Sequence, residues 1–253
     1  MKMINMGPIT DKTFIPRPIK ISLDDVLYPE RIKIIMGAKA PKFLYLIGNI
    51  ELLKPQSIGF CGSRKASLKG IETAKDCAEQ AANNHIIVIS GNATGVDIEA
   101  HFNSLKAGGS TIIVIPEGID HFKIKNELKS VWDWQRILII SQFEPNDPWK
   151  AFRAMTRNQL IIALSRVMIV IEAGEKGGTM NAGMETLKMG LPLFVAEYED
   201  MTHDAKGNKI LLGLGAQRLA KSKITHRANM QHVIEQVQTD VGIQHALRQG
   251  KLF

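Results

Sequence analysis

The sequence predicts an α/β fold in which a doubly wound, mostly parallel sheet carries helices on both faces. Six short runs rich in Ile and Val recur between residues 57 and 196, and almost no charged residue lies inside them. Such runs are typical of strands that are buried on both faces of a parallel sheet. The segments between them have the length and the apolar period of helices, and this alternation is the pattern of a Rossmann-like fold.

The predicted elements follow one another in a regular order. The strands are, along the chain, Ser57–Cys61, Ile86–Ser90, Thr111–Ile115, Ile137–Ser141, Val167–Glu172 and Pro192–Ala196. The clearest helix covers Ser67–Asn83, one side of which carries Ile71, Ala74, Cys77, Ala78 and Ala81. A last helix is expected over Ala228–Val237.

The chain divides into three segments. Residues 1–54 form a short N-terminal helical lead-in, in which Ser22 and Asp25 have the spacing of a helix cap. Residues 55–220 form the Rossmann-like core, and residues 221–253 form a C-terminal basic helical tail. Internal repeats, low-complexity tracts and long linkers are absent from the sequence, so one domain with short appendages is expected.

The composition excludes several classes of protein. The 253 residues hold 32 Lys and Arg against 25 Asp and Glu, which gives a formal net charge of +7. No apolar run approaches the ~18 residues of a membrane-spanning helix, and the N-terminus lacks the apolar stretch of a signal peptide. Cys61 and Cys77 have no C-x-x-C partner, which argues against a disulfide scaffold or a zinc ribbon and favours the cytoplasm. The basic excess favours an acidic partner, most often nucleic acid.

Three glycine-containing loops follow predicted strands. They are Gly62-Ser63-Arg64-Lys65, Ser90–Asp97 and Glu172–Thr179, the last of which contains Lys176, Gly177 and Gly178. In an open α/β sheet these loops meet at the carboxyl ends of the strands, where helix N-termini favour anions. The loops therefore predict a phosphate-binding surface; alternatively, Gly and Ser only close tight turns. None of them matches a dinucleotide or P-loop fingerprint.

The segment Pro148–Asn158 suggests a second element of the same surface. Trp149, Arg153 and Arg157 recur every four residues, and Lys150 and Phe152 lie between them. A helix capped by Asp147 would present a basic face edged by aromatic rings, which suits single-stranded nucleic acid. In the alternative interpretation, Trp149 and Phe152 belong to the core and the arginines face solvent.

Catalytic and metal sites have weaker support. Ser90, Asp97 and His101 could form a hydrolase triad, but the G-x-S-x-G elbow is missing and Asp97 is placed to hold its own loop. Glu172 could act as an acid or base, although a lone carboxylate at a strand end more often fixes a neighbouring loop. The seven histidines show no metal-ligand spacing, so we expect no metal and no cofactor.

A series of motifs resembles the DNA-processing protein A (DprA, or Smf) family. YPERIKIIMGAKAPKFLYLIGNIELL (28–53) resembles the lead-in of that family, and IGFCGSR (58–64) its first strand and loop. The run ISGNATGVDIEAH (89–101) is similar to the signature Ser-Gly-x-Ala-x-Gly-Ile-Asp-x-x-Ala-His. Four further segments continue in the same order: TIIVIPEGID (111–120), RNQLIIALS (157–165), IVIEAGEKGGTMNAGME (169–185) and GNKILLGLGA (207–216).

The resemblance implies a single-stranded DNA-binding protein without catalysis. Members of the family dimerise and load a RecA-type recombinase onto DNA during natural transformation. Their DNA site corresponds to positions that the glycine-containing loops and the segment Pro148–Asn158 had already suggested. These are Gly62, Ser63 and Arg64, then Lys150, Phe152, Arg157 and Asn158, and finally Lys176, Gly177 and Gly178. From the first loop itself we add the neighbouring cation Lys65.

The sequence also departs from the family pattern. Thr94 and Gln159 stand where many members carry basic residues, which removes two cations, and we expect no room for the winged-helix domain of some members. Two related alternatives remain open, a small-nucleotide sensor and a phosphoribohydrolase. Gly177-Gly178-Thr179 resembles part of the hydrolase motif, but Ala182 occupies the position of its catalytic glutamate.

Overall fold

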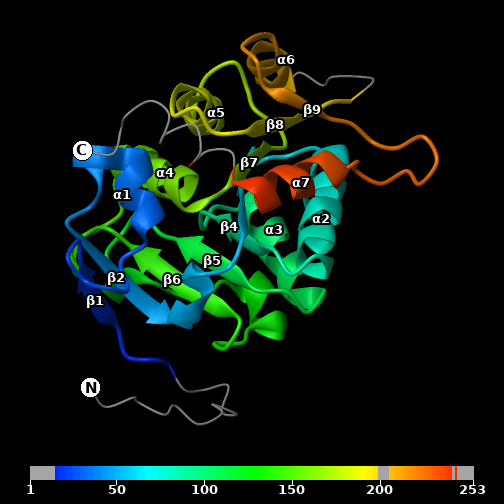
Figure 1. Cartoon of the computed structure of the whole chain (residues 1–253). Coiled ribbons are helices and arrows are strands. Elements are labelled where there is room, and N and C mark those ends of the chain that lie inside the picture. Colours follow the sequence, from blue (N-terminus) through cyan, green and yellow to red (C-terminus); the bar gives the residue numbers. More distant parts are fainter. Residues whose placement is uncertain (1–14, 199–204, 241–242, 244–253) are drawn as a thin grey trace.

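A computed structural model of the chain describes residues 15–198, 205–240 and 243. Through these residues runs a single nine-stranded sheet (Figure 1). The strand order is β1-β2-β6-β5-β4-β3-β7-β8-β9. The strands are β1 (Ile19–Ser22), β2 (Phe43–Gly48), β3 (Ser57–Cys61), β4 (Ile87–Ser90), β5 (Thr111–Val114), β6 (Ile137–Ser141), β7 (Val167–Val170), β8 (Leu193–Ala196) and β9 (Gln217–Leu219).

The predicted fold class is confirmed. All six predicted strands are present as β3 to β8, and they pair in parallel with one another and with β9. The helices are α1 (Glu30–Met36), α2 (Leu68–Asn83), α3 (Val96–Lys106), α4 (Ala151–Leu164), α5 (Gly178–Lys188), α6 (Lys206–Gly213) and α7 (Gln231–Thr239). Four short 3-10 helices complete the described chain: η1 (Gly37–Lys39), η2 (Ile50–Leu53), η3 (Ile119–His121) and η4 (Asn126–Val131).

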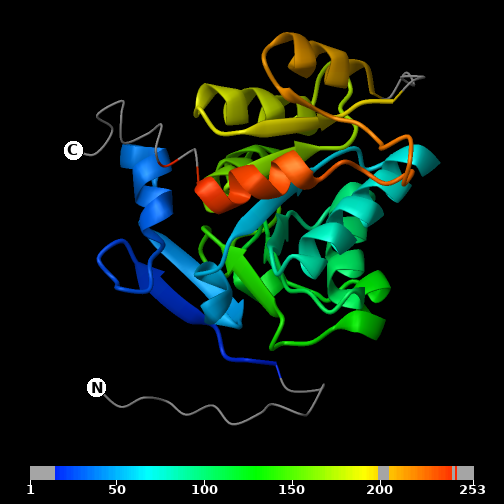
Figure 2. The same ribbon diagram turned by 45° about the vertical axis from the view of Figure 1, so that its right-hand side comes forward.

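The helices cover both faces of the sheet. Apolar side chains of α2, α3 and α7 pack on one face, and Figure 2 shows α7, drawn in orange to red, on the same side as α2. The apolar side chains of α1, α4, α5 and α6 pack on the other face. Each central strand therefore alternates its side chains between two buried layers, which explains the continuous Ile and Val runs of the sequence.

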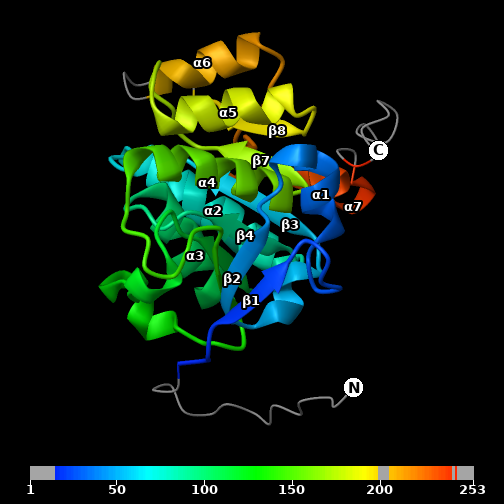
Figure 3. The same cartoon turned by 90° about the vertical axis from the view of Figure 1, so that its left-hand side faces the viewer.

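The N-terminal lead-in is more than helical. It contains the expected helix, α1, but the predicted cap at Ser22 is wrong, because Ser22 ends β1 and α1 begins at Glu30 after Pro29. The segment also contains β1 and β2, which extend the sheet beyond β6 in antiparallel pairing (Figure 3). Their order along the edge follows from the register, in which Tyr45 of β2 faces both Lys20 of β1 and Ser141 of β6. Residues 1–14 of the lead-in, and residues 241–242 and 244–253 of the tail, lie outside the described residues.

The chain reverses direction across the sheet between β3 and β7. From β3 it proceeds through β4 and β5 to β6, and it then returns to place β7 on the other side of β3. Open α/β sheets bind ligands at such a switch point, outside the carboxyl ends of the strands. None of the described helices is long and apolar enough to cross a membrane.

Candidate nucleic-acid interface

Two adjoining hollows lie at the carboxyl ends of the parallel strands. The first has a volume of about 450 Å³ and lies beside the ends of β3, α4 and α5. The second has a volume of about 320 Å³ and extends toward the residues that follow β4 and β5. We call the two hollows together the groove. Five residues line both hollows and form their shared wall, namely Arg64, Ala93, Trp149, Ala154 and Arg157.

The loop after β3 carries Arg64 into the groove. Gly62 packs so closely on α3 that a Cβ atom at this position would lie 2.5 Å from Cγ2 of Val96. The Ser63 hydroxyl accepts a hydrogen bond from the Lys65 amide at 3.0 Å and thereby closes the turn. Arg64 is exposed and lines both hollows, whereas the exposed Lys65 lines neither of them. The turn therefore directs one cation, not two, into the groove.

Glu172 fixes the start of α2. Its buried carboxylate accepts hydrogen bonds from the Ser67 amide (2.8 Å) and the Ser67 hydroxyl (2.5 Å). The same hydroxyl accepts a hydrogen bond from the Gly70 amide at 3.1 Å, so Ser67 is the N-cap of the helix. The interpretation of Glu172 as a residue that holds a neighbouring loop is confirmed, and this contact joins the loops after β3 and β7.

The loop after β7 leads into the uncapped N-terminus of α5. Asn208 anchors this loop, since its side chain accepts a hydrogen bond from the Ala173 amide and donates one to the Ile171 carbonyl, each at 2.8 Å. Gly177 has a φ of 111°, which favours glycine, and it offers no side-chain cap to the helix. Gly178 and Thr179, on the first turn of α5, line the first hollow, so the positive end of this helix meets the groove.

The β4–α3 loop is held from within by buried polar groups. The Asp97 carboxylate accepts hydrogen bonds from the Ser90 hydroxyl (2.9 Å) and the Ala93 amide (3.1 Å). The fully buried imidazole of His101 contacts the Gly91 carbonyl (2.7 Å) and the Thr111 hydroxyl (2.6 Å). Burial lowers the pKa of His101 to about 4. Both ring nitrogens of His101 contact these groups, and neither contacts Ser90 or Asp97. The three residues therefore hold the loop and do not form a hydrolase triad.

Arg157 is a buried cation on the shared wall. Only 7% of its surface is exposed, and its Nη1 donates a hydrogen bond to the Val114 carbonyl at 2.5 Å, whereas its Nε has no hydrogen-bond partner among the described residues. Burial lowers the pKa of Arg157; Asp97 and Glu117 oppose this effect, and the positive charge of Arg64 adds to it. Two guanidinium groups therefore repel each other beside the groove.

The prediction that the segment Pro148–Asn158 forms a helix with a basic face is wrong. α4 begins at Ala151 with Lys150 at its cap, not at Asp147. The reason is that Asp147 already forms an ion pair with Arg153 (2.5 Å), which withdraws Arg153 from solvent, while Arg157 is buried. The alternative interpretation is wrong as well, because the side chains of Trp149 and Phe152 are 53% and 59% exposed and do not belong to the core.

The structure brings together only some residues of the predicted site. Gly62, Arg64, Arg157, Asn158 and Gly178 line the first hollow. The other predicted residues lie on the same edge or close to it but line neither hollow; they are Ser63, Lys65, Lys150, Phe152, Lys176 and Gly177. Of the two departures from the family pattern, Thr94 lines the second hollow, whereas Gln159 lines a separate hollow beside α1 and lies outside the groove.

Lys125 is the cation that sequence reasoning missed. It lines the second hollow and also a further hollow of about 400 Å³, where Lys123 joins it. The segment Lys123-Ile124-Lys125 lies beyond η3, well past the end of β5, so no strand-to-loop signature marked it. Its one signal was a pair of closely spaced lysines in a long connection between two predicted strands.

Comparison with known proteins identifies the family of the chain. The family model of DNA recombination-mediator protein A matches residues 20–229. The chain belongs to this family. Among curated members, the DNA processing protein DprA of Streptococcus pneumoniae is 32% identical over 174 residues, which cover 68% of this chain and 61% of the relative. DprA of Bacillus subtilis is 27% identical over 176 residues, which cover 69% and 59%. The matched region of the chain thus spans about three fifths of these relatives.

Solved structures of DprA share the architecture. The Helicobacter pylori protein, whose structure concerns its single-stranded DNA binding mode, superposes with a TM-score of 0.70 at 28% identity and covers 87% of this chain and 96% of its own. The S. pneumoniae structure gives a TM-score of 0.71 at 28% identity, covering 79% and 70%. A molybdenum cofactor binding protein of Rippkaea orientalis, at 18% identity and a TM-score of 0.51, shares the fold alone.

Proposed function

We propose that this protein binds single-stranded DNA in the groove and does so without catalysis. The observation that carries the proposal is the pair of guanidinium groups on the shared wall, Arg64 exposed and Arg157 buried. Asp97 and Glu117 offset part of the charge of Arg157, an anion between the two guanidinium groups would relieve their remaining repulsion, and guanidinium groups suit phosphate oxygens. The N-terminus of α5 supplies a further positive end to the first hollow.

The lining of the groove also suits exposed bases. Besides the cations, the walls carry apolar and aromatic side chains, Ala93, Trp149, Ala154 and Met155. They also carry polar and acidic ones, which include Asn92, Thr94, Asp97 and Glu117. Unpaired bases can lie against such surfaces, whereas a duplex keeps its bases stacked inside and presents mainly phosphates. The groove therefore favours a single strand over a duplex. Membership of a DNA-processing family, one member of which binds single-stranded DNA, supports the same proposal.

The finer role follows from the family. We infer that the protein acts in the cytoplasm as a homodimer, protects single-stranded DNA and helps to load a RecA-type recombinase, as in natural transformation. The match in the order of motifs and over residues 20–229 supports this role. The recombinase would contact surfaces outside the groove, because the bound DNA strand occupies the groove itself.

Binding of a small nucleotide is the second candidate. A volume of about 450 Å³ for the first hollow lies within the usual range of small-molecule sites, ~300–1,000 Å³, so one nucleotide could occupy it alone. The phosphoribohydrolase alternative has less support, because the position of its catalytic glutamate is the buried Ala182. The size of the preferred ligand separates the two candidates.

The test is fluorescence anisotropy with labelled oligo-dT of several lengths at two salt concentrations. Affinity that rises with strand length, falls with salt and resists competition by duplex would support the proposal. Absent strand binding, together with a thermal shift caused by a mononucleotide, would contradict it and favour the small-nucleotide alternative.

A further inference from the structure

Trp149 is set apart from the other tryptophans of the chain. Trp132 and Trp134 are 7% and 6% exposed and pack edge to face with ring centroids 5.0 Å apart. Trp149 is 53% exposed, lies on the shared wall of the two hollows, and makes no hydrogen bond or ring contact through its side chain within the described residues. A large apolar ring is thus held in water at the centre of the groove.

The backbone that carries Trp149 is fixed from several sides. Arg153 pairs with Asp147 at 2.5 Å and donates a hydrogen bond to the Pro148 carbonyl at 2.7 Å. The Asp147 carbonyl accepts a hydrogen bond from the Gly118 amide at 2.8 Å, and its carboxylate accepts one from the Glu144 amide at 3.1 Å. The two residues before Trp149 are therefore anchored, and the backbone that carries the indole is held at the groove before any ligand arrives.

Phe152 provides a comparison within the same segment. Its ring is exposed to a similar degree, 59%, but it lines neither hollow, and the Arg153 guanidinium carbon lies 5.8 Å from its centroid. Exposure alone therefore does not distinguish the two rings; their position relative to the groove does. The aromatic ring among the cations of the shared wall is Trp149.

We propose that Trp149 is the stacking platform of the groove and that it separates two nucleotide subsites, one in each hollow. This inference rests on the proposed function. Every base has a π face, so stacking on an indole binds a strand without preference for sequence. On one side of the ring, Gly62 and the start of α5 face the first hollow; on the other side, Lys125 faces the second. A strand that crosses the shared wall places one base against Trp149 and its neighbouring phosphates near Arg64 and Arg157.

Intrinsic fluorescence tests this assignment directly. Since Trp132 and Trp134 are buried, added oligo-dT should quench the emission of Trp149 and protect it from iodide. The Trp149→Phe variant should lose the quenching yet bind the strand within a few-fold of the unmodified protein. Trp149→Ala should weaken binding on the order of tenfold or more, the usual effect of removing a stacking ring. The matched control Phe152→Ala should change affinity by less than about twofold.

The outcomes separate this inference from the proposed function. Strand binding that survives Trp149→Ala and leaves the emission of the unmodified protein unchanged would overturn the stacking platform while the DNA-binding proposal stands. A tenfold loss in Phe152→Ala, with Trp149→Ala unaffected, would move the platform to Phe152. If the unmodified protein binds no strand, the proposed function itself fails. Far-ultraviolet circular dichroism of each variant verifies that it is folded, which the exposure of both side chains leads us to expect.

Discussion

Arg64 and Arg157 have the same predicted role but lie in different environments. Both were expected to contact phosphate, yet Arg64 is exposed and Arg157 is buried with a bond to the Val114 carbonyl. Arg64 is thus free to pair with a ligand at little cost to the fold. Arg157 also holds the wall of the groove, so its removal combines loss of charge with loss of structure.

The substitution Arg64→Ala isolates the electrostatic component of binding. We expect weaker affinity for oligo-dT and oligo-dA alike, and a plot of log affinity against log salt whose slope falls by about one ion, because one phosphate contact is lost. Anisotropy titrations over a series of salt concentrations measure the slope. Lys65→Ala is the matched control, since Lys65 is the adjacent exposed cation and lines neither hollow. Equal slopes in the unmodified protein and Arg64→Ala would remove this arginine from the interface.

His101 makes the stability of the protein depend on pH. Its pKa is about 4 in the fold because the ring is buried, against ~6.5 in an unfolded chain. As the pH falls from ~6.5 toward ~4, the unfolded state takes up a proton that the native state excludes, and stability drops by about 3 kcal/mol. The contribution is fully present above the unfolded pKa of ~6.5.

Urea unfolding at a series of pH values from neutral to mildly acidic measures this dependence. His101→Asn should be less stable at neutral pH but lose less of its remaining stability on acidification. His85→Asn replaces an exposed histidine and should keep the original slope. Parallel slopes in His101→Asn and the unmodified protein would show that other groups cause the acid effect.

At the scale of elements, the sequence predicted those helices and strands whose positions are determined by apolar periodicity and by local capping residues. The strands β3 and β6 begin and end at the predicted residues, and α2, predicted over Ser67–Asn83, covers Leu68–Asn83 with Ser67 as its N-cap. The start of α4 was wrong because Asp147 is engaged by Arg153, a contact across a turn that no cap preference reveals. The four-residue strand β1 was missed because it exists only through its pairing with β2.

The junction between α2 and the loop after β7 predicts the effect of Glu172→Gln. Glutamine can turn its oxygen to the Ser67 amide and donate from its NH2 group to the Ser67 hydroxyl, so both partners stay bonded, but the two hydrogen bonds to a charged carboxylate are lost. We expect the free energy of unfolding to fall by about 1 kcal/mol, the usual difference between hydrogen bonds to a charged group and to a neutral one. Glu175→Gln, in the same loop but exposed, should leave stability unchanged. Thermal melts of both variants provide the comparison, and equal melting temperatures would contradict the role of Glu172.

At the scale of the whole molecule, topology assembles the groove. β3 lies between β4 and β7, so the loops after strands that are far apart in the sequence meet at one edge. The sequence could predict that edge, because parallel strands place their following loops together. It could not predict which side chains turn inward: Lys125 and Trp149 line the hollows, whereas Lys65 and Lys176 do not.

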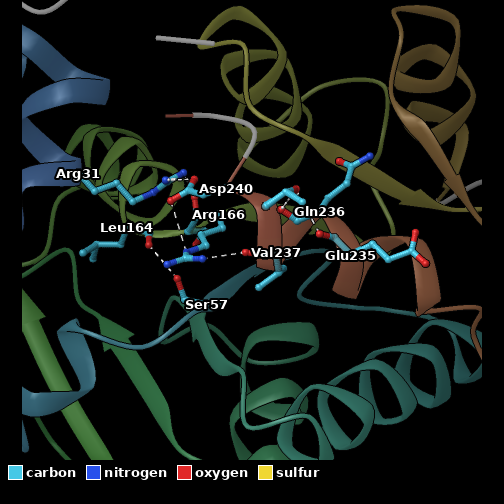
Figure 4. A network of polar contacts seen from close by, with 10 residues as sticks. Arg31, Ser57, Leu164, Arg166, Glu235, Gln236, Val237 and Asp240 are labelled. Atoms are coloured by element: carbon cyan, nitrogen blue, oxygen red, sulfur yellow. Dashed lines mark hydrogen bonds and ion pairs between the residues drawn. The ribbon is translucent and has the colours of Figure 1, made fainter. Parts of the chain in front are cut away.

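A polar network at the amino ends of the parallel strands, opposite the groove, connects the end of α7 to the rest of the fold (Figure 4). Asp240 pairs with Arg31 of α1 and with Arg166 just before β7, the latter at 3.4 Å. Arg31 also donates to the Ser165 carbonyl at 2.7 Å, and Arg166 to the Val237 carbonyl at 2.9 Å. These residues lie at the amino end of β7, away from the groove, so stability and strand binding should be separable.

The substitution Asp240→Asn tests that separation. It leaves the two guanidinium groups without their carboxylate, and hydrogen bonds to charged groups contribute ~1.5–3 kcal/mol, so we expect a loss of about 2 kcal/mol in the free energy of unfolding. Affinity for oligo-dT at room temperature should stay within about twofold, because no contact of the groove changes. Glu235→Gln, on an exposed position of α7, serves as the control for a loss of charge on that helix. If Asp240→Asn lost affinity for the DNA strand together with stability, the amino and carboxyl ends of the parallel strands would be coupled, and α7 would take part in binding.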